Sequence, residues 1–358
     1  MYTETFDSYS DAVDTTPLRH IRSDKQALEV YAELKQALQK TDFFKPDPMA
    51  YVFRGAWVTG GALAVYSLFL SQDNWGIKLL ACVLLGFLCV QSAAVAHEAA
   101  HGAVTRSKSR TQKIGLMFMN VFFGSSFAFW MDKHNQHHRK PNSCSDPDIR
   151  AGFFNFTEVD ARYAKGLSRF LTRRQHILIW PLSSLMGFSF KIGSIRYLMK
   201  SPSGNRLDIV ALVLHYLLWL VPGVFMMGLV DTLICYFLIT WFAGAYLAFI
   251  FITNHIGNPK YEDCETALGF LRQAATARNT SASPVITSLC NGLNSHIEHH
   301  LFPYVPFTRL ASGREITRQV LEKYGIRYHQ TSVIGAFKEC YAFNKQIAQY
   351  ARQESLAC

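Results

Sequence analysis

The chain has eight cysteines but none of the cysteine patterns that build a disulfide framework, a structural zinc site or an iron–sulfur cluster. No two of them form a CxxC pair along the 358 residues. Cys82, Cys89 and Cys235 lie inside apolar runs, where a free cysteine packs as a small hydrophobic side chain. The cysteine spacing therefore favours neither disulfides nor a zinc or iron–sulfur site.

Charged residues are also scarce. They make up 17% of the chain, whereas hydrophobic residues make up 49%. This composition is too apolar for a typical soluble enzyme and predicts a membrane protein. Residues 1–50 are polar and mixed in charge, and they lack the basic region and apolar core of a secretory signal. We therefore expect a cytosolic N-terminal segment over 1–50 and a membrane domain over 51–358.

Four apolar runs approach the length of about 20 residues that a helix needs to cross a bilayer. They cover about 51–70, 77–96, 209–228 and 232–252. Only Leu229, Val230 and Asp231 separate the last two runs, directly after Gly228, which predicts a tight turn. The pattern predicts an all-α membrane protein with four transmembrane helices in two hairpins.

Two further runs, about 114–130 and 176–195, are shorter or interrupted by Gly, Pro and Ser. We interpret them as interfacial or re-entrant helices.

The distribution of Lys and Arg predicts the orientation. Residues 97–206 contain 17 of them and residues 253–358 contain 11, whereas the loops at about 71–76 and 229–231 contain none. The positive-inside rule places both long segments on the cytosolic side, where they would form a cap. Most of the net charge of +10 then reflects topology and contact with anionic lipid, so nucleic acid is not expected as a partner.

Eight of the 13 histidines lie in three short boxes, all on the predicted cytosolic side. A further one, His255, ends the fourth apolar run at the same face. Chance placement does not explain two HxxHH patterns and one HxxxH. The boxes contain His97 and His101, then His134, His137 and His138, and finally His296, His299 and His300.

The first box, HEAAH, also matches the zinc metalloprotease pattern, in which Glu98 would be the general base. A mononuclear zinc hydrolase uses three protein ligands, fewer than half of the clustered imidazoles. Two metal ions with four or five nitrogens each would use them all, and imidazole suits iron. Di-iron oxidation is the leading hypothesis, and an intramembrane zinc metalloprotease is the alternative from another class.

Four segments carry a specific resemblance: HEAAHGAV, KHNQHHRKPN followed by DPDI, TARN at 276–279, and NGLNSHIEHHLFPYVP. Together they resemble the membrane fatty acid desaturases with three histidine boxes, over about residues 50–310. KHNxHHxxPN, DPDI and IEHHLFP are most similar to the front-end acyl-lipid group. The third box begins with His296, as in acyl-CoA types, where the front-end type usually has Gln. The acyl carrier therefore stays open between a lipid and a thioester.

The resemblance implies four transmembrane helices under a cytosolic cap that holds two iron ions. Carried over box by box, it gives the metal ligands His97, His101, His134, His137, His138, His296, His299 and His300. His255 matches an additional ligand after the fourth span, although the adjacent Asn254 could instead hold a metal-bound water.

Other polar residues would support these ligands. Carboxylates beside a ligand histidine commonly fix its tautomer and ring orientation, and the candidates are Glu98, Asp146, Asp148 and Glu298. Asp146 and Asp148 could equally be solvated loop charges. Arg278 and Asn279 in TARN are candidates for binding the site or a substrate headgroup.

Two features within the apolar runs each have a functional and a structural interpretation. His215 lies within the third run, where it is either functional or part of a helix–helix hydrogen bond. The aromatic residues at 122–123 and 127–130 could line an acyl tunnel or simply pack in the core.

The activity implied by the resemblance is O2-dependent removal of two hydrogens from a long acyl chain. A hydroxylase, ketolase or acetylenase with the same ligands is the closest alternative. The chain has no HPGG haem motif and no Rossmann fingerprint, so electrons must come from outside. We expect a ferredoxin or a separate cytochrome b5 to dock on the basic cytosolic face.

Overall fold

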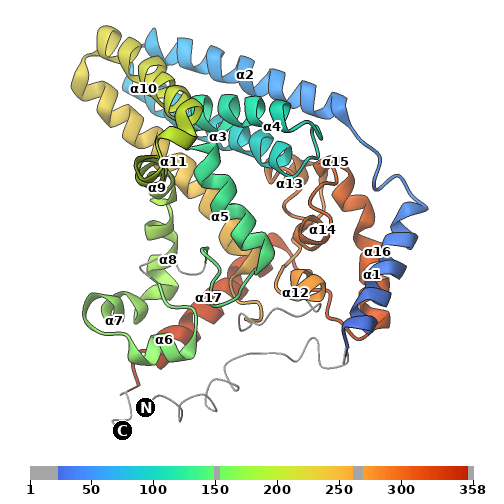
Figure 1. The fold of residues 1–358 in the computed structure, drawn as a ribbon. Helices are drawn as coiled ribbons and strands as arrows, with labels where there is room; N and C mark the ends of the chain where they lie inside the picture. Colours follow the sequence, from blue (N-terminus) through green and yellow to red (C-terminus); the bar gives the residue numbers. More distant parts are fainter. Residues whose placement is uncertain (1–22, 149–153, 261–268, 354–358) are drawn as a thin grey trace.

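The computed structural model describes residues 23–148, 154–260 and 269–353, and these ranges are helical without any strand (Figure 1). Four helices are long and apolar enough to cross a membrane: α2 (Pro48–Leu70), α3 (Trp75–Ala100), α10 (Arg206–Met227) and α11 (Leu229–His255). The prediction of an all-α protein with four candidate spans is confirmed for the described residues. The two-hairpin arrangement stays a prediction.

Helix α3 is the most enclosed of the four. It packs against α2, α11 and η3 (Leu116–Phe123), a π-helix. The outer faces of α2 and α10 are apolar and open; Phe53 is 72% exposed and Phe225 is 84% exposed. Such surfaces are stable in water only when covered, and a bilayer would cover these.

The span ends differ by a few residues from the apolar runs. Asp47 caps α2 by accepting a hydrogen bond from Ala50 N, so that helix begins at Pro48. Between α10 and α11 the turn is Gly228 alone, with φ 82° and ψ 166°, because glycine tolerates this conformation. Helices α3 and α11 continue past their apolar runs, and this extension places histidines at their C-terminal ends.

Two helix pairs are sharply bent. Helices α4 (Lys108–Gly115) and η3 meet α5 (Phe127–Arg139) at 105°, and α8 (Gln175–Ser183) meets α9 (Met186–Lys200) at 61°. Each pair is a broken span or a re-entrant loop, which agrees with the interpretation of these two runs. At the first bend Gly124 adopts φ 80°, and Asp208 Oδ1 accepts from Ser126 Oγ at 2.7 Å and Ala128 N at 3.0 Å. These contacts fix the direction of α5, which carries the second histidine box.

Of the remaining helices, α1, α12, α14 and α16 lie at the right of Figure 1, and α6 and α7 lie at its lower left. A buried core joins α1, α12, α14 and α16 through side chains such as Leu34, Leu271, Phe302 and Leu321, each fully buried. Burying each such side chain stabilises the fold by roughly 1.5–3 kcal/mol. The helices not yet given bounds are α1 (Asp24–Gln39), α6 (Glu158–Tyr163), α7 (Gly166–Thr172), η4 (Ser203–Asn205), α12 (Gly269–Ala275), α13 (Pro284–Leu289), α14 (His296–Leu301), α15 (Phe307–Leu310), η5 (Ala311–Gly313), α16 (Arg314–Lys323) and α17 (Val333–Tyr350).

Candidate metal centre

Four helix ends bring the nine predicted ligand histidines together. His97 lies in the last turn of α3, and His101 caps that helix. The second box occupies the last turns of α5, His255 is the last residue of α11, and the third box forms most of α14. The polar ends of long helices therefore converge on the buried short helix α14.

Five histidines form the first group. Each offers one ring nitrogen, and these nitrogens all lie within 4.8 Å of one another. The shortest separation joins His101 Nε2 and His134 Nε2, at 2.8 Å. Two nitrogens that bond one ion at about 2.1 Å and at a right angle are about 3.0 Å apart, so this spacing is close to that of two ligands of a shared metal. The group consists of His97, His101, His134, His138 and His299.

The other four histidines form the second group. The candidate nitrogens of His137, His255 and His300 lie within 4.8 Å of one another. His296 joins them, because its Nε2 lies 2.8 Å from His255 Nε2 and 3.1 Å from His300 Nε2. The two groups together match a site for two metal ions with four or five nitrogen ligands each.

The electrostatics of the site also fit metal binding. Burial, reinforced by neighbouring imidazoles, lowers the pKa of His134, His138 and His299 well below the usual histidine value. These rings are therefore neutral, as metal ligands must be. The Nε2 atoms of His97 and His138 are buried and have no hydrogen-bond partner among the described residues. Unpaired buried nitrogens are costly, and a bound metal would satisfy their lone pairs.

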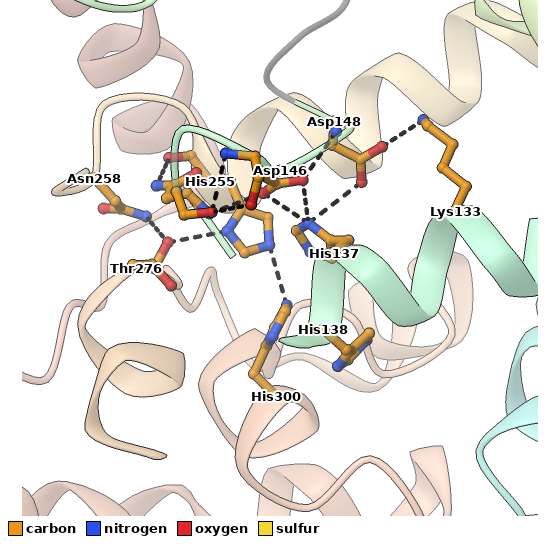
Figure 2. Close-up of polar contacts among 12 residues, drawn as sticks. Lys133, His137, His138, Asp146, Asp148, His255, Asn258, Thr276 and His300 are labelled. Atoms are coloured by element: carbon orange, nitrogen blue, oxygen red, sulfur yellow. Dashed lines mark hydrogen bonds and ion pairs between the residues drawn. The ribbon is translucent and has the colours of Figure 1, made fainter. Parts of the chain in front are cut away.

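Asp146 and Asp148 surround His137, as Figure 2 shows. His137 Nδ1 lies 3.0 Å from Asp146 Oδ2, which leaves Nε2 facing the other histidines. The Asp146 carboxylate is buried and accepts from the backbone N–H of Asn142 and of Asp148. Asp148 lies farther from His137, at 3.4 Å, and pairs with Lys133 at 2.5 Å. Burial raises the pKa of Asp148, but Lys133 and His137 outweigh it and lower that pKa to about 2. This geometry supports the predicted orienting role, most directly for Asp146.

Glu98 is buried and fully engaged. Its Oε1 lies 3.2 Å from His97 Nδ1, and its Oε2 accepts from Tyr51 Oη at 2.8 Å and Phe307 N at 3.2 Å. A general base needs access to a reacting water. The contacts favour an orienting role for Glu98 over the proteolytic one.

Glu298 has a different environment from the one predicted. Its carboxylate accepts from Asn279 Nδ2 and Tyr328 Oη, both at 2.8 Å, and burial raises its pKa. None of its hydrogen bonds in the described ranges reaches a histidine. Asn279 Oδ1 in turn accepts from Ile297 N, so this cluster anchors the start of α14. Glu298 supports the third box through the backbone.

His255 and Asn254 make distinct contacts. His255 Nδ1 lies 3.0 Å from Thr276 O, to which it donates, and this leaves Nε2 for a metal. Asn254 Nδ2 lies 3.2 Å from His296 Nδ1, the ring nitrogen opposite the one in the cluster. The geometry favours His255 as the ligand and Asn254 as a support.

Arg278 is fully buried and contacts the end of α11. Its Nη1 donates to Thr253 O at 2.7 Å, its Nη2 donates to Ile256 O at 3.0 Å, and its Nε lies 3.0 Å from Glu339 Oε2. Asn279 is buried as well. Contact with a substrate headgroup stays a prediction, and the observed contacts favour a role in holding His255 in place.

Gln273 is a residue that the sequence did not single out. Its Oε1 lies 2.7 Å from His300 Nδ1, and its Nε2 donates to His138 O at 2.5 Å. It therefore links the second and third boxes. A lone Gln has no diagnostic spacing, so no signal in the sequence indicated it.

An apolar cavity lies against the first group of histidines. His97, Phe123 and Trp130 line it, together with side chains from α9, α11 and the loop after α13. Of the aromatic residues considered for a tunnel, Phe123 and Trp130 thus face the cavity. His215 contacts Val121 O at 2.8 Å and Tyr236 Oη at 2.7 Å, which agrees with the helix–helix interpretation. The cavity lining suits an apolar molecule beside the histidine groups.

Comparisons with known proteins were consistent with this arrangement. Residues 73–332 match the model of the family described as fatty acid desaturase. The chain is 26% identical over 343 residues to the Delta(6)-fatty-acid desaturase fat-3 of Caenorhabditis elegans, covering 91% of this chain and 75% of that protein. It is 25% identical over 320 residues to a Delta(8)-fatty-acid desaturase of Euglena gracilis, covering 85% and 75%. It is 23% identical over 344 residues to the Acyl-lipid (9-3)-desaturase of Physcomitrium patens, covering 92% and 64%.

Proposed function

Because this chain belongs to the fatty acid desaturase family, a family of membrane-bound oxidoreductases, we propose that it uses O2 to introduce a double bond into a long acyl chain. The family match confirms the resemblance carried by the histidine boxes. The observation that supports the proposed reaction is the convergence of nine histidines in two adjacent groups, beside an apolar cavity.

The chain's residues would hold two iron ions. When bound, the irons would supply the O2 chemistry that removes two hydrogens from an unactivated carbon pair. The protein keeps each ring in a fixed orientation: Asp146 contacts His137, the Thr276 carbonyl contacts His255, and Gln273 contacts His300. Fixed ligands of this kind raise metal affinity.

The apolar cavity would hold the acyl chain. Phe123, Met119 and Leu247 among its walls exclude water, while His97 brings one end of the cavity to the metal centre. Holding one carbon pair beside the oxidant and keeping water away are the contributions that such a cavity makes to the reaction.

The topology completes the proposal. Residues 51–358 form one membrane domain after a cytosolic segment 1–50, with four spans in two hairpins and a cytosolic cap over 97–206 and 253–358. The basic cap is the docking face for a ferredoxin or a cytochrome b5 that brings electrons, and the substrate is an acyl lipid or an acyl thioester.

Lipid analysis tests this function. We expect cells with defined lipids to gain a new acyl double bond when they express the wild type, and to lack it with His138→Ala at equal protein level. A hydroxylated product without a new double bond would identify the hydroxylase alternative. One zinc and no iron per chain, with activity that survives replacement of both His134 and His299, would instead identify a zinc protease.

A further inference from the structure

One wall of the apolar cavity carries a buried polar side chain. Asn291 lines the cavity and is only 2% exposed. Neither its Nδ2 nor its Oδ1 has a hydrogen-bond partner among the described residues. Burying an amide without partners is costly, and native proteins rarely leave one in this state. An amide in this position is therefore suited to a polar group of a bound molecule.

The loop that carries Asn291 is held firmly. Arg54 Nη2 donates to Ser288 O at 3.2 Å, and Gln91 Nε2 donates to Leu289 O at 3.0 Å. Tyr246 Oη also donates to Leu289 O, at 2.5 Å. These three side chains come from α2, α3 and α11, so three candidate spans fix the last turn of α13, from which the loop of Asn291 begins. Asn291 is therefore a fixed point relative to the cavity.

The polarity of the surroundings changes across this loop. A second cavity shares Ile250, Cys290 and Leu293 with the first one. Its other walls include Thr253, Asn254, Thr280 and Asn294, and the Oδ1 of Asn294 also lacks a partner among the described residues. Cys290, the chain neighbour of Asn291, lines both cavities, so Asn291 lies next to the place where the apolar chamber meets the more polar one.

We propose that Asn291 binds the carbonyl group of the acyl substrate, by donating a hydrogen bond from Nδ2. This inference rests on the proposed desaturase function. Every ester or thioester carrier places a carbonyl at the start of the apolar chain, where the polarity of the cavities changes. Oδ1 remains for a donor that accompanies this group, such as a water molecule. Because His97 lines the same cavity, Asn291 fixes the number of carbons between the carbonyl and the reacting pair.

If Asn291 served only to shape the turn, Asn291→Gly would behave like the wild type. The φ of Asn291 is 51°, in the left-handed region that asparagine tolerates better than most residues. Glycine adopts this conformation without strain. Asn291→Gly therefore preserves the turn and removes only the amide.

The experiment compares substrates with and without the carbonyl, using the full chain in membranes. One arm uses an 18-carbon acyl ester of glycerophosphocholine and its ether-linked counterpart. The other arm uses 18-carbon acyl-CoA and the matching S-alkyl thioether. In the arm that contains the natural carrier, we expect the wild type to favour the carbonyl compound by about three- to ten-fold in kcat/KM. Asn291→Gly should lose this preference and give mixed double-bond positions.

Leu289→Ala is the matched control, because it changes the apolar wall of the same cavity without removing a polar group. Its ratio of kcat/KM for the ester over the ether, or for the thioester over the thioether, should equal that of the wild type. An unchanged ratio and an unchanged double-bond position in Asn291→Gly would overturn the inference. A wild type that forms no double bond in either arm would instead overturn the proposed function.

Discussion

His255 and His296 place their Nε2 atoms 2.8 Å apart, although they come from the end of a candidate span and the start of a six-residue helix. Two imidazole nitrogens at this distance repel each other when both present lone pairs. A shared cation removes that repulsion. The spacing therefore agrees with His255 and His296 as ligands of one metal ion.

Replacing His255 tests the composition of that site. We expect His255→Asn to lower bound iron from two ions toward one per chain and to abolish desaturation, because the second group loses a central nitrogen. Asn254→Ala should keep most of the iron, since Asn254 contacts the outer nitrogen of His296. Elemental analysis of purified protein measures both. His176→Asn, in α8 and outside both groups, is the control. Full iron content in His255→Asn would contradict its assignment as a ligand.

Removing one orienting carboxylate should weaken metal binding without removing a ligand. Asp146→Asn keeps the shape but loses the charge that faces His137 Nδ1. Loss of such a partner typically costs about 10- to 100-fold in metal affinity. Asp148→Asn should have a smaller effect, because that carboxylate lies 3.4 Å from His137 and is 45% exposed. Iron retention against increasing chelator concentration measures the metal affinity of each variant. Equal retention in Asp146→Asn and Asp148→Asn would refute the expected difference between them.

Replacing Arg278 tests whether this residue supports the structure or binds the substrate. Arg278→Ala leaves the carbonyls of Thr253 and Ile256 without their donor in a buried region. We expect a loss of about 3–5 kcal/mol of stability, by analogy with other broken buried charge contacts. The KM of the remaining folded enzyme should stay close to that of the wild type. Thermal unfolding in detergent and steady-state kinetics test the two parts. A large rise in KM with unchanged stability would support headgroup binding instead.

The sequence predicted that these histidines would gather, and the structure brings them together in two groups, because the signal is local. Each box spans five residues or fewer, and helical geometry then brings its imidazoles to one side. In α14, His296, His299 and His300 fall within about 100° of one another around the helix axis. Glu298 lies about 160–200° from His296 and His300 and therefore points away, toward Asn279 and Tyr328. The same rule that predicted the ligands explains why the orienting role predicted for Glu298 is not seen.

The supporting contacts could not be predicted, because they join distant segments. Gln273 reaches His300 across 27 residues, and the Thr276 carbonyl reaches His255 across 21. A backbone carbonyl has no sequence signature at all. The predicted span ends were also inexact. Hydropathy falls where the polar ligands begin, but the backbone hydrogen bonds of α3 and α11 continue beyond that point.

Close helix packing leads to a prediction on stability. A Cβ on Gly244 of α11 would lie 2.1 Å from Ser184 O and 2.7 Å from Gly187 N, so the short link between α8 and α9 packs directly on this glycine. Gly244→Ala should therefore lower stability by about 1–3 kcal/mol or more. Gly60→Ala in α2 meets nothing within 4 Å and should be neutral or slightly stabilising, because alanine favours helix. Thermal denaturation of the two variants in the same detergent gives the comparison, and equal melting temperatures would contradict the packing argument.

The last prediction concerns pH and a histidine outside the metal centre. Burial, helped by the charges of Arg278 and Arg327, lowers the pKa of His329 to about 4, although Glu339 opposes this shift. The unfolded chain binds this proton near pH 6.5 and the folded chain binds it only near pH 4. Stability from this group is therefore complete above about pH 6.5 and is lost as the pH falls toward 4, by at most about 3 kcal/mol.

His329→Gln should remove that part of the pH dependence, because glutamine can still contact Asn258 and cannot take up the proton. Melting temperatures at pH 7.5 and 4.5 should therefore differ less in His329→Gln than in the wild type. His176→Gln serves as the control and should keep most of the wild-type difference, since the ring of His176 packs on Tyr341 at the surface of α17. If both variants keep the full difference, acid destabilisation arises at other groups and His329 is not the sensitive one.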